Sequence, residues 1–151
     1  MQSGALASHL VGDLETVEAR LLSGPQVEVP IVNHFAPGIY LREAIMPAGA
    51  LVIGHAHKHE GFNIVLTGSA LVKIDGKICE IKAPCILKAA AGTRKIAYVI
   101  EEMRWVNVHA TTETDLAVLE DTLVEKSDTF KAHEKTLQEM KQKRISLGGV
   151  A

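Results

Sequence analysis

Short apolar stretches separated by turn residues fill the middle of the chain, and they predict β-strands rather than helices. Alternating apolar and polar positions rich in β-branched side chains indicate strands over residues 27–32, 39–46, 62–67, 70–74 and 77–81. Asp75-Gly76 separates the last two, and because both residues tolerate positive φ it predicts a tight hairpin. Residues 95–100 and 103–110 form a second predicted hairpin, with Glu101 and Glu102 near its turn. The pattern predicts an all-β fold, a barrel or jelly roll.

Helices are predicted only towards the two ends of the chain. Residues 13–22 carry one apolar stripe and stop at Gly24-Pro25. Residues 111–115 supply N-cap candidates for a short helix through Leu119, which a strand-like segment follows. A last helix is expected over residues 129–144, capped by Ser127-Asp128. Its apolar stripe is thin, so we expect this helix to be either solvated or docked on a partner.

Length and charge limit the classes of protein that fit. The 151 residues suit one domain. We divide them into an N-terminal arm and helix (1–24), a β-barrel (25–126), and a C-terminal helix and tail (127–151). A net charge of −2 indicates no basic face, so nucleic acid is not an expected partner. The sequence shows neither an apolar run of membrane-spanning length nor a signal-peptide pattern, so we expect a cytoplasmic protein that is neither secreted nor membrane-bound.

Three histidines precede the strand predicted at residues 62–67. In an extended segment alternate side chains share a face, so His55, His57 and His59 can converge as half of a metal site. A tight turn near residues 58–61 would pair this segment with the following strand. If the turn centres on Glu60, His57 lies opposite Asn63 and His59 lies in the turn, exposed to solvent.

The same stretch resembles a known family. The spacing of Gly49, His55-x-His57 and Gly68 is similar to the first motif of the cupin superfamily. The resemblance implies a cupin-type jelly-roll barrel and a glutamate ligand at position 61. Here position 61 is Gly61, and Glu60 stands one place early, so the geometry of the turn decides whether Glu60 points inward.

The second cupin motif corresponds to residues 90–95, where only Gly92 is kept. Lys95 stands where the resemblance implies the last histidine ligand, and an ammonium group has no lone pair for a metal. In the hairpin predicted for residues 95–110, Lys95 and His109 are opposite each other and share a face, so His109 can replace the missing ligand.

These considerations give one candidate site with two open interpretations. The predicted metal ligands are His55, His57, His109 and Glu60, and Asn63, Lys95 and His59 are expected around the cavity. A divalent transition metal, Fe, Mn, Ni or Zn, suits nitrogen and oxygen donors of this kind. The alternative is a polar barrel interior that holds no metal.

A narrower resemblance covers about residues 25–130. The segments 35–43, 63–68, 83–85, 92–95 and 105–111 are similar to small cupin-like proteins encoded by tailed bacteriophages and prophages. This resemblance implies a place in the virion or in the cytoplasm of the infected bacterial host. It favours a non-enzymatic, virion-associated assembly protein, with other virion proteins as partners.

Two alternatives to the assembly role stay open. One is a metal-dependent cupin enzyme, a dioxygenase, isomerase or lyase, acting on a small molecule. The other is a metal-free module that binds a sugar or another small ligand. Apolar residues on both faces of the strand at residues 62–67 indicate burial on both sides, so we also expect a homo-oligomer.

Overall fold

The computed structural model describes residues 12–146, which form two compact units. One unit comprises residues 27–125, and the other comprises residues 12–26 together with residues 126–146. The arm predicted at residues 1–10 and the tail after Ser146 lie outside the described residues.

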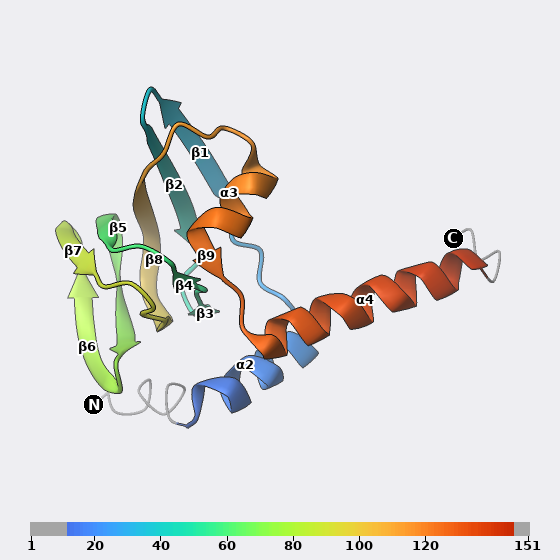
Figure 1. The fold of residues 1–151 in the computed structure, drawn as a ribbon. Coiled ribbons are helices and arrows are strands. Elements are labelled where there is room, and N and C mark those ends of the chain that lie inside the picture. Colours follow the sequence, from blue (N-terminus) through green and yellow to red (C-terminus); the bar gives the residue numbers. More distant parts are fainter. Residues whose placement is uncertain (1–11, 147–151) are drawn as a thin grey trace. The chain divides into compact units, whose positions relative to one another are not determined.

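The smaller unit pairs the two helices predicted at the ends of the chain, α2 (Leu14–Ser23) and α4 (Asp128–Ser146). Ser127 caps α4, because its Oγ accepts a hydrogen bond from the Phe130 N–H at 3.0 Å. The same hydroxyl donates to the carboxylate of Glu18 on α2. The first turn of α4 is therefore tied to α2, as Figure 1 shows. Between residues 12 and 146, no helix has the length and apolar character needed to span a membrane.

The larger unit is mostly antiparallel β-structure. Seven strands form one sheet: β1 (Ile31–Ala36), β2 (Ile39–Met46), β3 (Leu51–Ile53), β5 (Gly61–Ile74), β6 (Lys77–Lys82), β7 (Cys85–Ala89) and β8 (Lys95–Ala110). Two short strands, β4 (Ala56–His57) and β9 (Val124–Glu125), form a separate pair. Helix α3 (Leu116–Leu123) leads directly into β9.

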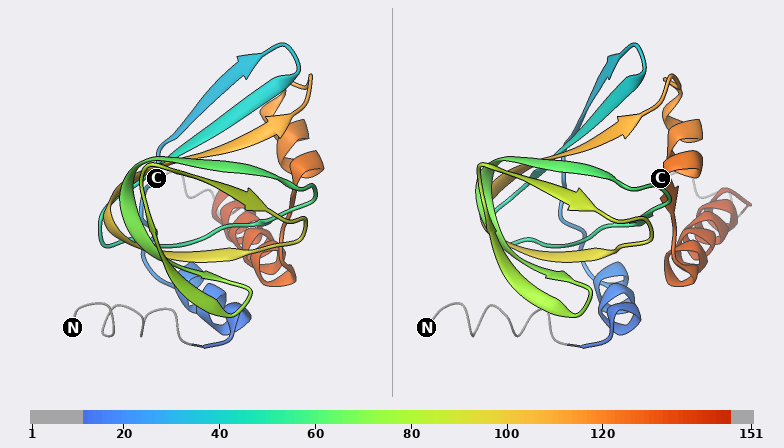
Figure 2. Two further views of the ribbon diagram at one scale, coloured as in Figure 1. Left: turned by 90° about the vertical axis from the view of Figure 1, so that its left-hand side faces the viewer. Right: turned by 60° about the vertical axis from the view of Figure 1, so that its left-hand side comes forward.

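The long strands β5 and β8 organise the sheet, because they pair along their length and change neighbours midway. At one end they lie between β7 and β2, with β1 outermost, and at the other end they lie between β6 and β3. Figure 2 shows how the curved strands turn these two halves towards each other. Apolar side chains from both halves form one core: Ala44, Met46, Ala50, Val65, Ala70, Val72, Ile81, Ala97, Val99, Met103 and Trp105. This two-layered arrangement is a jelly roll, as the strand pattern predicted.

Gly68 marks the change between the two halves. The register of β5 against β8 shifts around it, and its φ is +87°. A Cβ at this position would lie 2.2 Å from the carbonyl oxygen of Glu102, so no other residue fits without moving the backbone. The Glu101-Glu102 step therefore lies within a continuous strand beside a bulge. The hairpin predicted for residues 95–110 was wrong.

Other expectations can be compared directly with the strands. The predicted strand at residues 39–46 and the Asp75-Gly76 hairpin are confirmed, with positive φ at both turn residues. The first strand begins at Ile31, four residues later than predicted. The expected pairing of the histidine segment with the strand after it was wrong, because β4 pairs with β9 and His57 lies opposite Val124.

Candidate functional site

Two neighbouring rows of inward-facing residues cross the half of the sheet that contains β1, β2, β8 and β5. In the deeper row the directly paired residues are apolar: Ile31, Ala44, Trp105 and Val65. Two positions further along each strand, the corresponding row is polar: Asn33, Arg42, Asn107 and Asn63. Because side chains two residues apart in a strand share a face, the same face changes from apolar to polar within one step.

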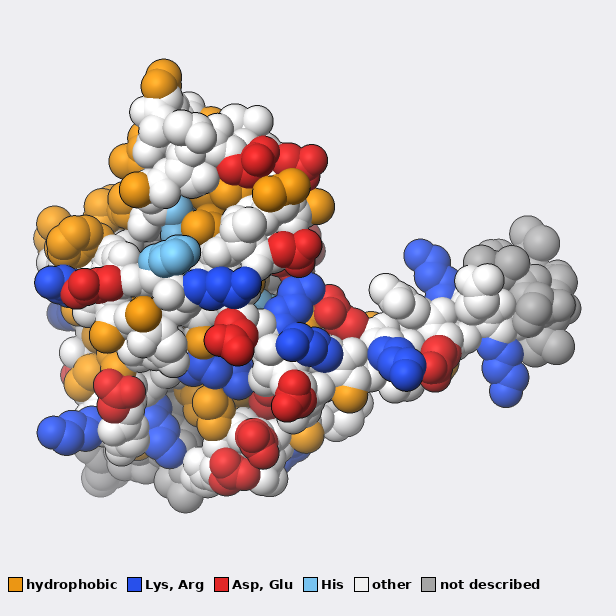
Figure 3. Space-filling model, viewed as in Figure 1, with side chains coloured by type: hydrophobic (Ala, Val, Ile, Leu, Met, Phe, Trp, Pro, Cys, Tyr) orange, Lys and Arg blue, Asp and Glu red, His pale blue; other side chains and the backbone are white. Residues whose placement is uncertain are grey.

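A cavity of about 600 Å³ opens at this change. Apolar residues such as Val29, Ile31, Met46, Val52, Val72 and Ala97 line its inner part. Its polar lining comes from strands β1, β2 and β8, from the segment around β4, from the loop before β8 and from α3: Asn33, Tyr40, Arg42, His55, His57, Thr93, Lys95, Asn107, His109 and Glu120. Figure 3 shows histidine side chains at the surface beside those of Lys or Arg.

Two hydrogen bonds set the orientation of the asparagine side chains in the cavity. The indole Nε1–H of Trp105 donates to Oδ1 of Asn107 at 3.3 Å, and the Tyr40 hydroxyl donates to Oδ1 of Asn33. Each asparagine thus uses its oxygen within the protein. Their amide N–H groups are left as donors for another molecule.

A series of ring contacts leads from the hairpin between β1 and β2 to the histidines. Phe35 stacks on Tyr40 with ring centroids 4.9 Å apart, and Tyr40 stacks on His109 at 5.8 Å. His109 and His57 follow, with centroids 5.2 Å apart and ring planes tilted by 49°. These ring contacts hold the imidazole rings of His57 and His109 beside the cavity.

Burial and neighbouring cations keep these histidines neutral. Burial lowers the pKa of His57 to about 4, helped by the charges of His109, Lys95, Arg42 and His55. Burial also lowers the pKa of His109, and the charge of Arg42 adds to that effect. The pKa of Lys95 is lowered by burial as well, an effect that the carboxylate of Asp75 opposes. At neutral pH the imidazoles of His57 and His109 are therefore uncharged, in a cavity that also contains the basic side chains of Arg42 and Lys95.

Helix α3 and strand β9 form one side of the cavity. Asp115 caps α3 by accepting a hydrogen bond from the Ala117 N–H at 2.9 Å. Leu116, Leu119, Glu120, Leu123 and Val124 all line the cavity. The segment is attached to the histidine strand through the β4–β9 pair and through Lys58, whose backbone N–H donates to the Leu123 carbonyl at 2.9 Å.

The structure brings together most, but not all, of the residues predicted for the site. His55, His57, His109 and Lys95 line one cavity. Lys95 and His109 lie near the two ends of the single strand β8 and both line the cavity, whereas the prediction placed them opposite each other in a hairpin. His59 is exposed and outside the lining, and Asn63 is buried at 2% exposure without reaching the cavity. Glu60 points outward, where it forms an ion pair with Lys88 at 2.9 Å.

The donor set does not fit the metal that the resemblance implies. With Glu60 outside, the one carboxylate among the described lining residues is that of Glu120, which is exposed on α3, and Lys95 occupies the last ligand position. Within the described part of the chain, no group of three or more His, Cys, Asp or Glu side chains is arranged to hold a metal ion. Arg42 and Lys95 also place positive charge where a divalent cation would bind, which opposes its binding.

Sequence reasoning missed Arg42, Tyr40, Asn33 and Asn107. One signal was present for Arg42, because it alternates along the strand with Tyr40, Ala44 and Met46 and so shares their face. The adjacent Glu43 points to the opposite face of the strand, so alternation places Arg42 on the inward face without an acidic residue of the same strand beside it. Asn33 and Asn107 carry no such signal, because only strand register places them beside Arg42.

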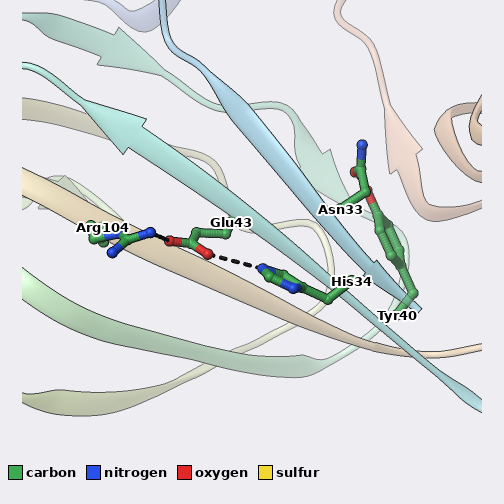
Figure 4. Close-up of polar contacts among 5 residues, drawn as sticks. All are labelled: Asn33, His34, Tyr40, Glu43 and Arg104. Atoms are coloured by element: carbon green, nitrogen blue, oxygen red, sulfur yellow. Dashed lines mark hydrogen bonds and ion pairs between the residues drawn. The ribbon is translucent and has the colours of Figure 1, made fainter. Parts of the chain in front are cut away.

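The outer face of the same sheet holds a second polar cluster, formed by His34, Glu43 and Arg104 (Figure 4). The Glu43 carboxylate is buried and lies 2.9 Å from His34 Nε2 and 2.7 Å from a guanidinium nitrogen of Arg104. The hydrogen bond from His34 lowers the pKa of Glu43 against the opposing effect of burial, and Arg104 lowers it further. This carboxylate is therefore ionised, with one oxygen hydrogen-bonded to His34 and the other in an ion pair with Arg104.

Comparisons with known proteins identify the fold. The sequence matches no protein-family model and no curated protein. Among solved structures, an uncharacterised protein with a double-stranded β-helix domain from Klebsiella pneumoniae matches with a TM-score of 0.50 and 20% identity, over 61% of this chain and 80% of that chain. An RmlC-like cupin family protein from Methanocaldococcus jannaschii has a TM-score of 0.48 and 12% identity, over 56% of this chain and 82% of its own. KdgF from a Halomonas species has a TM-score of 0.47 and 18% identity, and the match covers 60% of this chain and 86% of that chain.

The match to the Klebsiella pneumoniae protein supports the fold predicted from the sequence. The chain has the cupin-type jelly roll, or double-stranded β-helix, with short helices near both ends. At 20% identity the likeness extends to the fold alone. The predicted resemblance to phage-encoded proteins stays a prediction.

Proposed function

We propose that this cupin-fold protein binds a small organic molecule in the cavity of its jelly roll. The observation that carries the proposal is the cavity of about 600 Å³, whose apolar inner part adjoins a rim of oriented hydrogen-bond donors. Ligand sites of this size usually combine a mainly apolar lining with a few fixed polar groups. The amide N–H groups of Asn33 and Asn107 and the basic group of Arg42 supply such polar groups here.

The lining supports binding more than catalysis. The described residues around the cavity include no serine or cysteine to act as a nucleophile, and Thr93 supplies the single aliphatic hydroxyl. No donor set for a metal is arranged there either. The metal-dependent enzyme that the sequence left open therefore lacks support from the geometry of the described residues.

The single tryptophan of the chain allows a direct test. Trp105 lines the cavity, and its indole N–H donates to Asn107, so a bound molecule would change the indole signal. We would screen charged and neutral compounds against ¹⁵N-labelled protein and follow this resonance by NMR. Saturable shifts of the indole signal, with the amide of outward-facing Phe62 unmoved, support the proposal. The proposal fails if no compound moves the indole signal, or if Phe62 moves equally.

A second candidate function is the assembly role predicted from the sequence, with homo-oligomers and other virion proteins as partners. It is supported by large apolar side chains exposed on the outer faces of β5 and β7: Phe62 (51%), Leu66 (50%) and Ile86 (69%). Figure 3 shows hydrophobic side chains gathered at the left of the view, over these strands. Exposed apolar patches of this kind commonly mark protein interfaces.

Two measurements test this second candidate. If the outer face joins copies of the chain, light scattering at micromolar concentration gives the mass of an oligomer, and Ile86→Lys reduces it without changing the unfolding temperature. A monomeric wild type contradicts the homo-oligomer. Peptide mass spectrometry of purified, nuclease-treated phage particles tests the virion role. A fixed copy number relative to the major capsid protein supports it, and absence from particles of a phage whose infected cells contain the protein rejects it.

A further inference from the structure

Two basic side chains enter the cavity without an acidic partner. Arg42 and Lys95 both line it, and within residues 12–146 neither makes an ion pair or a hydrogen bond. Asp75 influences Lys95 only from beyond ion-pair distance. Among the described lining residues Glu120 alone is acidic, and it is exposed on α3, where it has interactions of its own. The lining thus contains two basic groups and one acidic group.

The sheet fixes the direction of both basic side chains. Arg42 alternates along β2 with inward-facing Tyr40 and Ala44, so its side chain must enter the same face. Lys95 begins β8 and shares its face with Ala97 and Val99, both of which are buried in the core. Turning either side chain outward would require a register shift that exposes core residues. Both basic groups are therefore built into the site.

Both groups act on the same small volume. The positive charges of Lys95 and Arg42 each disfavour protonation of His57, and that of Arg42 also disfavours protonation of His109. Lys95 is partly buried without a counter-ion, which is unfavourable in the free protein because its ammonium group loses hydration without gaining a partner, whereas Arg42 is exposed and keeps its hydration. A ligand with negative charge removes that cost. The planar guanidinium of Arg42 can donate two parallel hydrogen bonds, and with the neighbouring amide donors of Asn33 and Asn107 it matches the two oxygens of a carboxylate.

We propose that the ligand is a small organic carboxylate, bound directly by Arg42 and Lys95, and that these side chains supply the positive charge that a metal ion would bring. The inference depends on the proposed binding function and adds the class of ligand. It also accounts for the disagreement between the donor set and the metal implied by the resemblance. Lys95 takes the place of a ligand to the metal and itself carries the charge.

Calorimetric titration of chelator-treated protein tests the inference with matched pairs of probes, benzoate with benzamide and glutarate with glutaramide. We expect at least one carboxylate to bind and its amide to bind roughly 10-fold or more weakly, since charge-assisted hydrogen bonds are lost. Lys95→Met and Arg42→Met should each weaken carboxylate binding by a similar factor. Lys95→Arg, which keeps the charge, should retain part of the affinity. Lys82→Met on the outer side of β6 is the matched control and should leave affinity unchanged.

The outcomes separate this inference from the function on which it rests. Circular dichroism and unfolding temperature would confirm that each variant is folded before it is titrated. Equal binding of amide and carboxylate, or carboxylate binding that requires added Zn²⁺, Mn²⁺, Ni²⁺ or Fe²⁺, overturns the inference while binding in the cavity stands. If neutral compounds move the Trp105 signal but no carboxylate binds, the carboxylate inference fails while the proposed binding of a small molecule stands. If no compound of either kind binds, both proposals fail.

Discussion

Arg42 and Glu43 are neighbours on β2, yet they belong to two different kinds of polar cluster. Glu43 faces outward, where His34 and Arg104 satisfy its carboxylate. Arg42 faces inward, where it lines the same cavity as Lys95, His57 and His109 and makes no ion pair among the described residues. The outer cluster is complete within the protein, whereas the inner cluster requires something from outside. Charge balance therefore distinguishes a group that stabilises the fold from one that is available for binding.

The largest expected effect on stability comes from removing the central carboxylate of the outer cluster. Glu43→Gln keeps the shape of the buried side chain but removes its negative charge, so Arg104 loses the partner of its ion pair. We expect a loss of about 2 kcal/mol in the free energy of unfolding, because breaking a buried charged contact costs more than the contact contributes. Urea denaturation at neutral pH measures it. A loss below about 0.5 kcal/mol would mean that the outer cluster is not structural.

The pH dependence of stability tests whether the ionised carboxylate of Glu43 stabilises the fold. Because the pKa of Glu43 is lowered in the folded protein, the unfolded chain binds a proton more readily, so the stabilisation is fully present above the unfolded pKa of about 4.5. It is lost as the pH falls through the lower pKa of the folded state. Urea denaturation from about pH 7 to about pH 3 should show the difference between wild type and Glu43→Gln shrinking at the acidic end. A constant difference would contradict this cause.

Arg104 and Arg42, on opposite faces of the sheet, allow a direct comparison, and the expected changes in unfolding free energy are the smallest of the set. Arg104→Gln should cost about 1 kcal/mol, because the guanidinium is half exposed and its pair with Glu43 is partly screened. Arg42→Gln removes no ion pair and should change stability by less than about 0.5 kcal/mol. Parallel urea denaturation curves measure both variants. Equal losses of unfolding free energy for the two variants would contradict the distinction between the inner and outer clusters.

Much of the fold could be predicted from local signals. The strand at residues 39–46 and the Asp75-Gly76 hairpin follow from alternation and from turn chemistry, and the caps at Asp115 and Ser127 follow from side-chain hydrogen bonding. Each of these signals lies within a few residues of the structure that it determines. Local sequence is therefore enough to locate such elements.

The errors concern pairings between distant residues. Glu101-Glu102 looks like a turn until Gly68, some thirty residues earlier, is seen to lie against its backbone. The partner of His57 is Val124, which no local pattern indicates. The site was predicted in part for the same reason. His55, His57 and Lys95 were identified by motif, whereas Arg42, Asn33 and Asn107 form one row only through the register of three strands.

One measurement tests the central claim most directly, that the unpaired positive charge of the cavity serves to bind an anionic ligand. The ¹⁵N-indole signal of Trp105 would be followed in wild type and in Arg42→Gln during titration with benzoate and glutarate. Our account predicts a saturable shift in wild type for at least one of these probes, and a much weaker response in Arg42→Gln despite an unchanged unfolding temperature. Equal shifts in the two proteins, or no shift with either carboxylate, would contradict it.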